Sequence, residues 1–180
     1  MHESAHETPD LAATTLLLAR AKALARESAG VITTERLEVL EFGLGNETYA
    51  FELSQVREVL VLVELTPLPR VPAHILGITQ IHGQILAVVD LRKIFGLPER
   101  GLQNSWHLIV LQSTTMEFAV VAERITGVRH LPVAGLQPSL PSLNDTRASY
   151  LKGISADGTA VLSVASLLAD PQLIVQQSDS

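Results

Sequence analysis

Side chains that commonly perform chemistry are dispersed along this chain of 180 residues. The central histidines form no i,i+4 pair and lack the spacing of zinc ligands; they are His74, His82, His107 and His130. Ser149 and Ser163 have no His/Asp arrangement that the sequence fixes, so neither is favoured as a nucleophile. Gly43 and Gly45 lack the third glycine and the following helix of a dinucleotide loop. We therefore expect no catalytic residue, no metal and no cofactor, and a protein that is not an enzyme.

The amino-acid composition limits the classes of partner that this protein is expected to bind. Apolar residues make up 47% of the chain, which is enough for a hydrophobic core. A formal charge of −6 and an aromatic content of 4% disfavour nucleic-acid binding, which depends on clustered cations and stacking rings. Cysteine is absent, which excludes disulfides and is compatible with a reducing cytoplasm. The apolar run at residues 16–19 is too short to cross a bilayer. We expect a cytoplasmic protein that inserts into no membrane.

The stretch from Gly77 to Leu91 is the centre of the chain's organisation. It predicts two strands joined at a His82-Gly83 turn, where glycine allows positive φ or close backbone approach. The strand after Gly83 is almost wholly apolar, so we expect it to be buried on both faces. Asp90 then caps a short helical turn.

The remaining segments are mostly strands. Residues 1–10 form a polar tail, and residues 11–29 are rich in helix formers. Strands are predicted at 37–42, 47–53, 56–64, 106–112, 116–121, 125–131, 150–155 and 160–164, with a helix at 165–169. Prolines at 67, 69 and 72 make the connection before Gly77 irregular.

The second half of the sequence repeats the first. Residues 49–52 and 56–59 match residues 118–121 and 125–128, and Lys152-Gly153 repeats Leu76-Gly77. A strand order that occurs twice favours two small β-rich lobes, each closing its sheet to remove free edges. We expect a binding groove between these lobes.

From about residue 35 to 169 the sequence resembles the CheW family of chemotaxis adaptors. The resemblance rests on the order of several motifs: Val-x-Glu-Val at 56–59, the proline connection, the hairpin at 77–83, Val88-Val89-Asp90-Leu91 and Tyr150-Leu151-Lys152-Gly153. It implies a mainly β fold of two similar five-stranded SH3-like β-barrel lobes packed side by side, with short helices and an N-terminal helical extension. The expected domains are a leader at 1–34, a CheW-like domain at 35–175 whose second lobe begins near 103, and a tail at 176–180.

The same resemblance implies what the protein binds. CheW proteins link chemoreceptors to a histidine kinase at membrane-associated receptor arrays, so the expected partners are a CheA-type histidine kinase, through its regulatory domain, and a chemoreceptor cytoplasmic tip. Matching motif positions give the partner-binding residues Val56, Glu58, Gly77, Gln80, His82, Ala119 and Val128. The family usually has Asn-Leu-Arg-Gly where this chain has Gln80-Ile81-His82-Gly83, so a contact made by that arginine is altered.

Other interpretations of these residues stay open. The valines at 56, 59 and 128 suit a core as well as an interface, and Glu58 suits a solvated strand face. The segment 11–29 either packs on its own domain or docks a partner or membrane surface. We expect a bulky residue at Gly77 to weaken partner binding while leaving the fold intact. The alternatives to a chemotaxis adaptor are a scaffold of a non-flagellar chemosensory pathway and a tandem β-barrel module that binds a small ligand.

Overall fold

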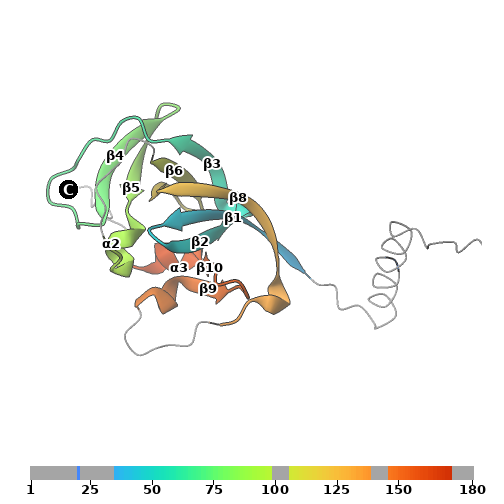
Figure 1. The fold of residues 1–180 in the computed structure, drawn as a ribbon. Helices are drawn as coiled ribbons and strands as arrows, with labels where there is room; N and C mark the ends of the chain where they lie inside the picture. The colour runs from blue at the N-terminus through green and yellow to red at the C-terminus, as the bar shows by residue number, and fades with distance from the viewer. Residues whose placement is uncertain (1–19, 21–34, 99–105, 139–145, 172–180) are drawn as a thin grey trace, which may run out of the picture. The chain divides into compact units, whose positions relative to one another are not determined.

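The computed structural model describes residues 20, 35–98, 106–138 and 146–171 (Figure 1). The described residues from Arg36 onward belong to one compact unit. The helix predicted at 11–29 lies outside the described residues except for Arg20, which is helical and exposed. The predicted tail at 176–180 also lies outside them. Among the described residues, no helix is both long enough and apolar enough to cross a membrane.

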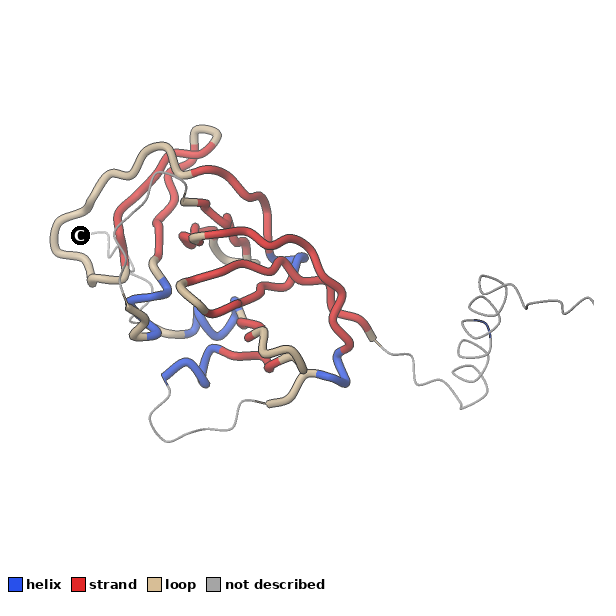
Figure 2. Tube along the Cα trace, in the orientation of Figure 1, coloured by secondary structure: helices blue, strands red, loops and turns tan. Residues whose placement is uncertain are grey.

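The described part of the chain is mainly β and forms two five-stranded sheets (Figures 1 and 2). We call the first lobe A; its strands, in spatial order, are β8 (Arg124–Pro132), β1 (Arg36–Leu44), β2 (Glu47–Glu52), β10 (Ala160–Leu162) and β9 (Leu151–Ile154). The second is lobe B, with the order β3 (Val56–Val61), β6 (His107–Gln112), β7 (Glu117–Ala122), β5 (Gln84–Val89) and β4 (Ile75–Ile81). The predicted two-lobe, five-stranded β architecture is confirmed.

Each sheet takes strands from both halves of the sequence. The β1–β2 hairpin is completed by β8, β9 and β10, while the β6–β7 hairpin is completed by β3, β4 and β5. Two parallel pairings, β5 with β7 and β10 with β2, join the strands of one half of the sequence to the hairpin of the other half. A boundary near residue 103 therefore separates the two sequence repeats but not the two sheets.

The repeat is visible in the strand registers. In lobe B, Val56 and Glu58 pair with neighbouring residues of β6, so that Arg57 forms a bulge. In lobe A, Ile125 and Gly127 pair in the same way with neighbouring residues of β1. These strands are the ones that the sequence repeat had matched, so the duplication extends to the bulges.

A second feature occurs in both halves of the sequence: a glycine of β4 or β9 lies directly against the segment that follows β3 or β8. After β3, Thr66 forms an isolated antiparallel bridge with Ile78 of β4; after β8, Gln137 does the same with Ile154 of β9. Gly77, at φ 149°, leaves no room for a Cβ, which would overlap the carbonyl oxygen of Thr66. The expectation that a bulky residue at Gly77 leaves the fold intact is therefore wrong, because the backbone of residue 66 fills that space.

Three clusters of buried side chains form the core. The largest draws on both sheets and includes Phe42 and Phe51 of lobe A with Ile109 and Val120 of lobe B. Smaller clusters lie within lobe B and lobe A. From Val39 onward strand β1 is buried on both faces, because its side chains enter both the shared cluster and the lobe A cluster. Core side chains therefore fill much of the region where a groove between the lobes was expected.

Short helices follow the fifth strand of each repeat, β5 and β10. In α2 (Leu91–Phe95) the Asp90 carboxylate accepts a 3.0 Å hydrogen bond from the backbone nitrogen of Arg92, which confirms the predicted cap. In α3 (Val164–Ala169) Ser163 caps in the same manner. The remaining helical turns are η1 (Leu53–Gln55), η2 (Val133–Gly135) and η3 (Thr146–Tyr150).

Candidate functional site: the tip of lobe B

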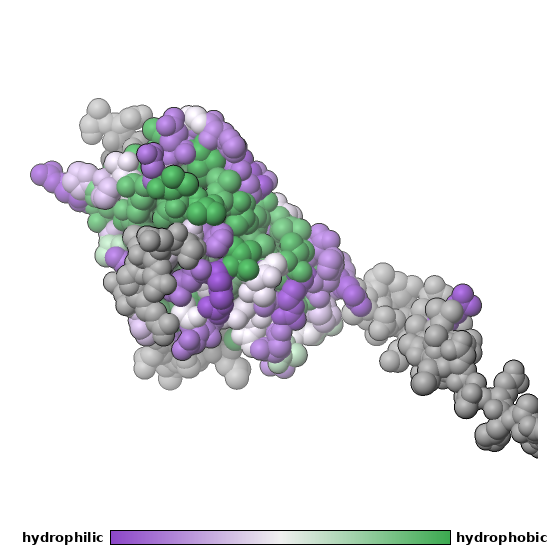
Figure 3. Space-filling model, turned by 45° about the horizontal axis from the view of Figure 1, so that its top comes forward, coloured by the Kyte–Doolittle hydropathy of each residue, from purple (hydrophilic) through white to green (hydrophobic). Residues whose placement is uncertain are grey.

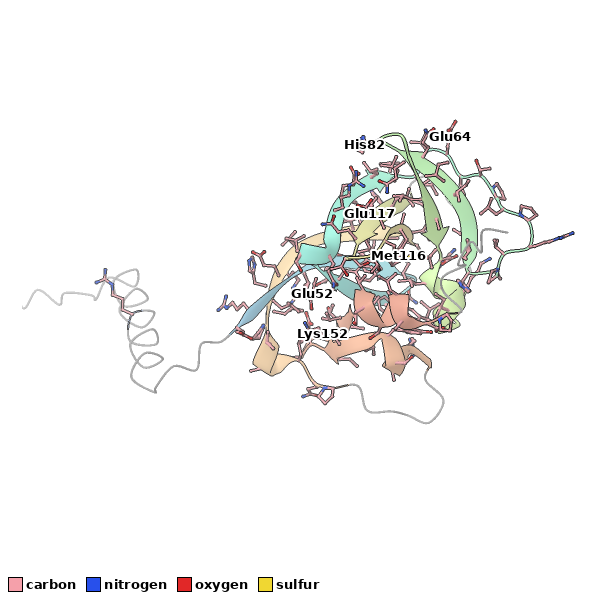
Figure 4. All side chains as sticks on the ribbon, turned by 180° about the vertical axis from the view of Figure 1, so that it is seen from behind. Glu52, Glu64, His82, Met116, Glu117 and Lys152 are labelled. Atoms are coloured by element: carbon pink, nitrogen blue, oxygen red, sulfur yellow. The ribbon has the colours of Figure 1, made fainter. Side chains whose placement is uncertain are left out.

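The β4–β5 hairpin ends in the two-residue turn that the sequence predicted. His82 and Gly83 have φ values of 48° and 80°, and positive φ at both central residues is the geometry that matches the twist of the flanking strands. No atom lies within 4 Å of a Cβ placed on Gly83, so this turn stands open to solvent. The His82 side chain is 66% exposed at the end of the lobe (Figure 4).

This hairpin reaches further than its repeat in lobe A. Its pairing runs from Ile75–Val89 to Ile81–Gln84, whereas the matching β9–β10 pairing ends at Ile154–Ala160. The additional rungs have no counterpart in lobe A among the described residues. We call these rungs, together with the adjoining parts of β3 and residues 62–66, the tip of lobe B.

Charged side chains link the hairpin to β3 and β7. Nε2 of His82 lies 3.1 Å from Oε2 of Glu58, a residue of β3. Arg57 donates to the Glu117 carboxylate at 2.6 Å and to Oε1 of Gln84 at 3.0 Å. Within the described residues, Oε1 of Glu58 is buried without a hydrogen bond, and its nearest cation is Nε of Arg57 at 3.8 Å. One end of lobe B thus carries an interlocked set of charges.

Large apolar side chains are exposed beside these charges. Ile85 is 65% exposed on the hairpin, and Val61 and Val63 are 57% and 87% exposed at and after the end of β3. Residues 62–66 run antiparallel to β4, held by a 2.8 Å hydrogen bond from Oγ1 of Thr79 to the carbonyl oxygen of Glu64. Figure 3 shows apolar surface gathered on the face that is tilted forward from the top of Figure 1, with hydrophilic residues around it. Exposed apolar area with a polar rim is typical of protein docking surfaces.

The structure unites some of the predicted partner-binding residues and separates others. Glu58, Gln80 and His82 lie together at the tip of lobe B, and Gln80 is exposed. Val56 is half-buried against the shared core, and Val128 is 52% exposed on β8 of lobe A.

Two of the predicted residues are inaccessible. Ala119 is fully buried in the lobe B core between Val88 and Val110, so its side chain is not exposed at the surface of this fold. Gly77 is buried beneath residue 66 and serves the fold locally.

Sequence reasoning missed part of this surface. The strand after Gly83 was expected to be buried on both faces, but Ile85 is exposed because the hairpin extends past the neighbouring strand β7, whose ladder with β5 involves only Val88 and Val89. Arg57 and Glu117 were also missed, since residues 60 positions apart carry no local signal of their pairing. The two exposed valines at and just after the end of β3, Val61 and Val63, lie in a sequence that resembles a buried strand.

Lobe A holds a pocket of a different kind, with a volume of about 230 Å³. Arg147 and Glu47 form an ion pair at its wall, at 2.8 Å, and Tyr49 donates a hydrogen bond to the same carboxylate. Burial, together with the hydrogen bond to Glu47, raises the pKa of Tyr49 well above its usual value. The described residues contain no group of three or more His, Cys, Asp and Glu that could hold a metal.

Comparison with known proteins identifies the family. The family model for the CheW-like domain matches residues 38–176. The chain belongs to the CheW-like family. It is 24% identical to the chemotaxis protein CheW of Treponema pallidum (strain Nichols) over 137 residues, which is 74% of this chain and 81% of that protein. It is 34% identical to protein FrzA of Myxococcus xanthus over 113 residues, 63% of this chain and 70% of FrzA.

A solved CheW structure has the same fold. The scaffolding protein TtCheW from Thermoanaerobacter tengcongensis matches with a TM-score of 0.66 and 25% identity, over 72% of this chain and 90% of that chain. The CheW-like domain therefore contains both lobes, and the family to which the chain belongs is one of scaffold and adaptor proteins.

Proposed function

We propose that this chain is a chemotaxis signal-transduction adaptor that couples methyl-accepting chemoreceptors to a CheA-type histidine kinase. It would act by protein–protein binding and perform no reaction of its own. Membership of the CheW-like family supports the class of function. The exposed tip of lobe B supports the mode of action, because it offers apolar anchors with charged neighbours on an extended hairpin.

The observation that carries the proposal is the exposure of Ile85 beside the Glu58–His82 pair. An aliphatic side chain that is 65% exposed on an extended hairpin gains nothing for the isolated fold, whereas burial against a partner removes its apolar area from water. The neighbouring charges would fix the register of the partner and exclude unsuitable ones. We therefore assign the kinase regulatory domain to this tip and the receptor tip to a second face.

The test is co-purification with the regulatory region of a CheA-type kinase from the same cell, followed by light scattering. Wild-type protein should form a stable complex, and Ile85→Asp should lose it. The matched control is Val133→Asp, which places the same charge on a valine of η2 in lobe A that is 36% exposed. The control should bind like wild type.

Three results would contradict the proposal: no complex with folded wild-type protein, equal binding by Ile85→Asp, or equal loss in both variants. A complex formed only with a kinase of a non-flagellar pathway would support the adaptor mechanism and assign the protein to that pathway.

A further inference from the structure

The side chains of Gln84 and Glu117 lie at the tip end of the lobe B core. Alternate residues of a strand point to the same face, so Gln84 of β5 shares a face with Leu86, and Glu117 of β7 shares one with Ala119. Leu86 and Ala119 are both buried in the lobe B cluster. Because β5 and β7 run parallel, their two apolar rows end in these polar groups at the same end of the lobe.

Arg57 of β3 joins the two polar groups. Its guanidinium donates to Oε1 of Gln84 at 3.0 Å and to the Glu117 carboxylate at 2.6 Å. Arg57 forms the bulge of β3, and a bulge turns a side chain away from the regular alternation of its strand. We call these two contacts the Arg57 clamp, which links the hairpin to β3 and β7.

Backbone pairing does not hold this part of the hairpin to β7. In the strand pairings of the described residues, β5 meets β7 only at Val88 and Val89, whereas it pairs with β4 as far as Gln84. Residues 84–87 therefore extend beyond the ladder with β7. Side chains of β3 reach this overhanging part of the hairpin through the Arg57 clamp and through the contact between Glu58 and His82.

The clamp on Gln84 also fixes the direction of Ile85. Successive side chains of a strand point to opposite faces, so a Gln84 held at the end of the core leaves Ile85 pointing outward. Ile85 is accordingly 65% exposed. A shift of the strand by one residue would exchange the two faces and turn Ile85 toward the core. The hydrogen bond from Arg57 to Gln84 opposes such a shift.

The repeat in lobe A forms its sheet without this arginine. The sequence match between residues 56–59 and 125–128 places Thr126 at the position of Arg57, and Thr126 is exposed on β8. The β9–β10 pairing of lobe A is also shorter and lacks the additional rungs of the β4–β5 hairpin. The five-stranded sheet therefore does not require the clamp, which occurs in the lobe that has the long hairpin.

We propose that Arg57 is a positioning residue for docking at the tip of lobe B: it clamps Gln84 to Glu117 and thereby presents Ile85 to the partner. Loss of Arg57 removes the permanent cation that Glu117 shares with Glu58, which lies 3.8 Å from Nε of Arg57, and releases the overhanging hairpin. A hairpin that moves more freely loses more conformational entropy on docking. The statement about docking rests on the proposed function, whereas the clamp is a property of the isolated chain.

The first test measures affinity for the kinase regulatory region. Arg57→Met keeps an apolar stem but loses the guanidinium, and it should bind about three- to tenfold more weakly than wild type, the size expected for lost hydrogen bonds. Arg57→Lys keeps the charge without the forked donors and should fall between the two. The matched control is Arg124→Met, which removes an exposed arginine of β8 that donates to the carbonyl oxygen of Gly45 at 2.6 Å. The control should bind like wild type.

Two further variants separate positioning from a simple loss of charge or of stability. The double variant Arg57→Met/Glu117→Gln has the net charge of wild type and should still bind weakly, because the clamp is absent. In an Ile85→Ala background, Arg57→Met should reduce affinity less than it does in wild type, because Arg57 acts through Ile85. Urea denaturation of each variant shows that it is folded.

The second test needs no kinase. The chain contains no cysteine, so Ile85→Cys provides a single attachment point for a spin label. The mobility of this label should rise with Arg57→Met and with Gln84→Ala, and stay unchanged with Arg124→Met. Gln84→Ala removes the acceptor of the clamp and tests the same point if Arg57→Met does not fold.

Unchanged label mobility in Arg57→Met and Gln84→Ala would overturn the clamp. Wild-type affinity in Arg57→Met, recovery of affinity in the charge-neutral double variant, or an undiminished effect in the Ile85→Ala background would overturn the positioning role while the proposed function stands. If folded wild-type protein forms no kinase complex, the proposed function and the docking role both fail, and the label still decides whether Arg57 holds the hairpin.

Discussion

The backbone of Thr66 occupies the space that a side chain on Gly77 would fill. Thr66 and Ile78 exchange two backbone hydrogen bonds of 2.8 and 2.9 Å, and these hold the segment after β3 against β4. A Cβ on Gly77 would also lie 3.0 Å from the Cα of Pro67. The glycine is therefore needed where the proline-containing connection crosses the edge of lobe B, and the same arrangement recurs at Gly153, where a Cβ would lie 3.2 Å from the carbonyl oxygen of Gln137.

Substitution of Gly77 should destabilise the protein. Gly77→Ala combines an unfavourable φ of 149° with a collision against backbone, and we expect the free energy of unfolding to fall by at least about 2 kcal/mol. Gly83→Ala is the control, because its φ of 80° costs about 1 kcal/mol while its Cβ enters open space. Urea denaturation of both variants measures the difference. Equal losses would mean that the connection moves aside at no cost.

The caps of α2 and α3 should contribute different amounts to the free energy of unfolding. Asp90 caps α2 and also holds the guanidinium of Arg92 through contacts of 2.9 and 3.1 Å, with both side chains buried. Arg92 further lies 4.1 Å from the ring centre of Trp106. Asp90→Ala should cost about 3 kcal/mol or more, because it leaves a buried cation without its main counter-charge. Ser163→Ala, which removes only a cap, should cost about 1 kcal/mol. Chemical denaturation of the two variants compares them, and similar losses would show that the buried pair adds no stability.

Local patterns predicted the parts of this fold that depend on neighbouring residues. The His82-Gly83 turn and the Asp90 cap each involve backbone within a few positions, and both are confirmed. The duplication was also readable, because equivalent strands keep equivalent glycines and apolar positions. The sequence did not show that strands of one half complete the sheet of the other half. Hydrophobic periodicity does not distinguish a strand that pairs with the preceding hairpin from one that pairs with the following hairpin.

The candidate site was predictable only in part for the same reason. Glu58, Gln80 and His82 came from motif positions, and the structure places them together. The exposure of Ile85 depends on where β7 stops pairing with β5, which is a tertiary property. A long apolar strand has the same sequence pattern whether its end is covered or open.

Two residues that shared one predicted role should respond oppositely to substitution. Ala119 is fully buried, so Ala119→Leu should overpack the lobe B core and lower the free energy of unfolding by about 1–3 kcal/mol. Val128 is 52% exposed, so Val128→Ser should change stability by no more than about 0.5 kcal/mol. Thermal and urea unfolding test both. A stable Ala119→Leu variant would show a softer core than the structure indicates, and a destabilised Val128→Ser variant would place that valine in a packed environment.

Stability at acid pH should depend on the link between β8 and the β9–β10 turn. Hydrogen bonds from Ser155 and Arg129 lower the pKa of Asp157 from 3.8 to about 2. A carboxyl whose pKa falls on folding stabilises the protein above its unfolded-state pKa, and that contribution is lost as pH falls from about 4 to about 2. Because half of the Asp157 side chain is exposed, we expect the contribution at pH 7 to stay below about 1 kcal/mol. Asp157→Asn should therefore be slightly less stable than wild type at pH 7, and the stabilities of the two proteins should converge as pH approaches 2.

Urea denaturation at several pH values measures this difference in stability. Arg129→Met and the double variant separate the contribution of the ion pair from that of the Ser155 hydrogen bond. If Asp157→Asn differed from wild type by the same amount at pH 3 and pH 7, ionisation of Asp157 would have no part in stabilising this turn.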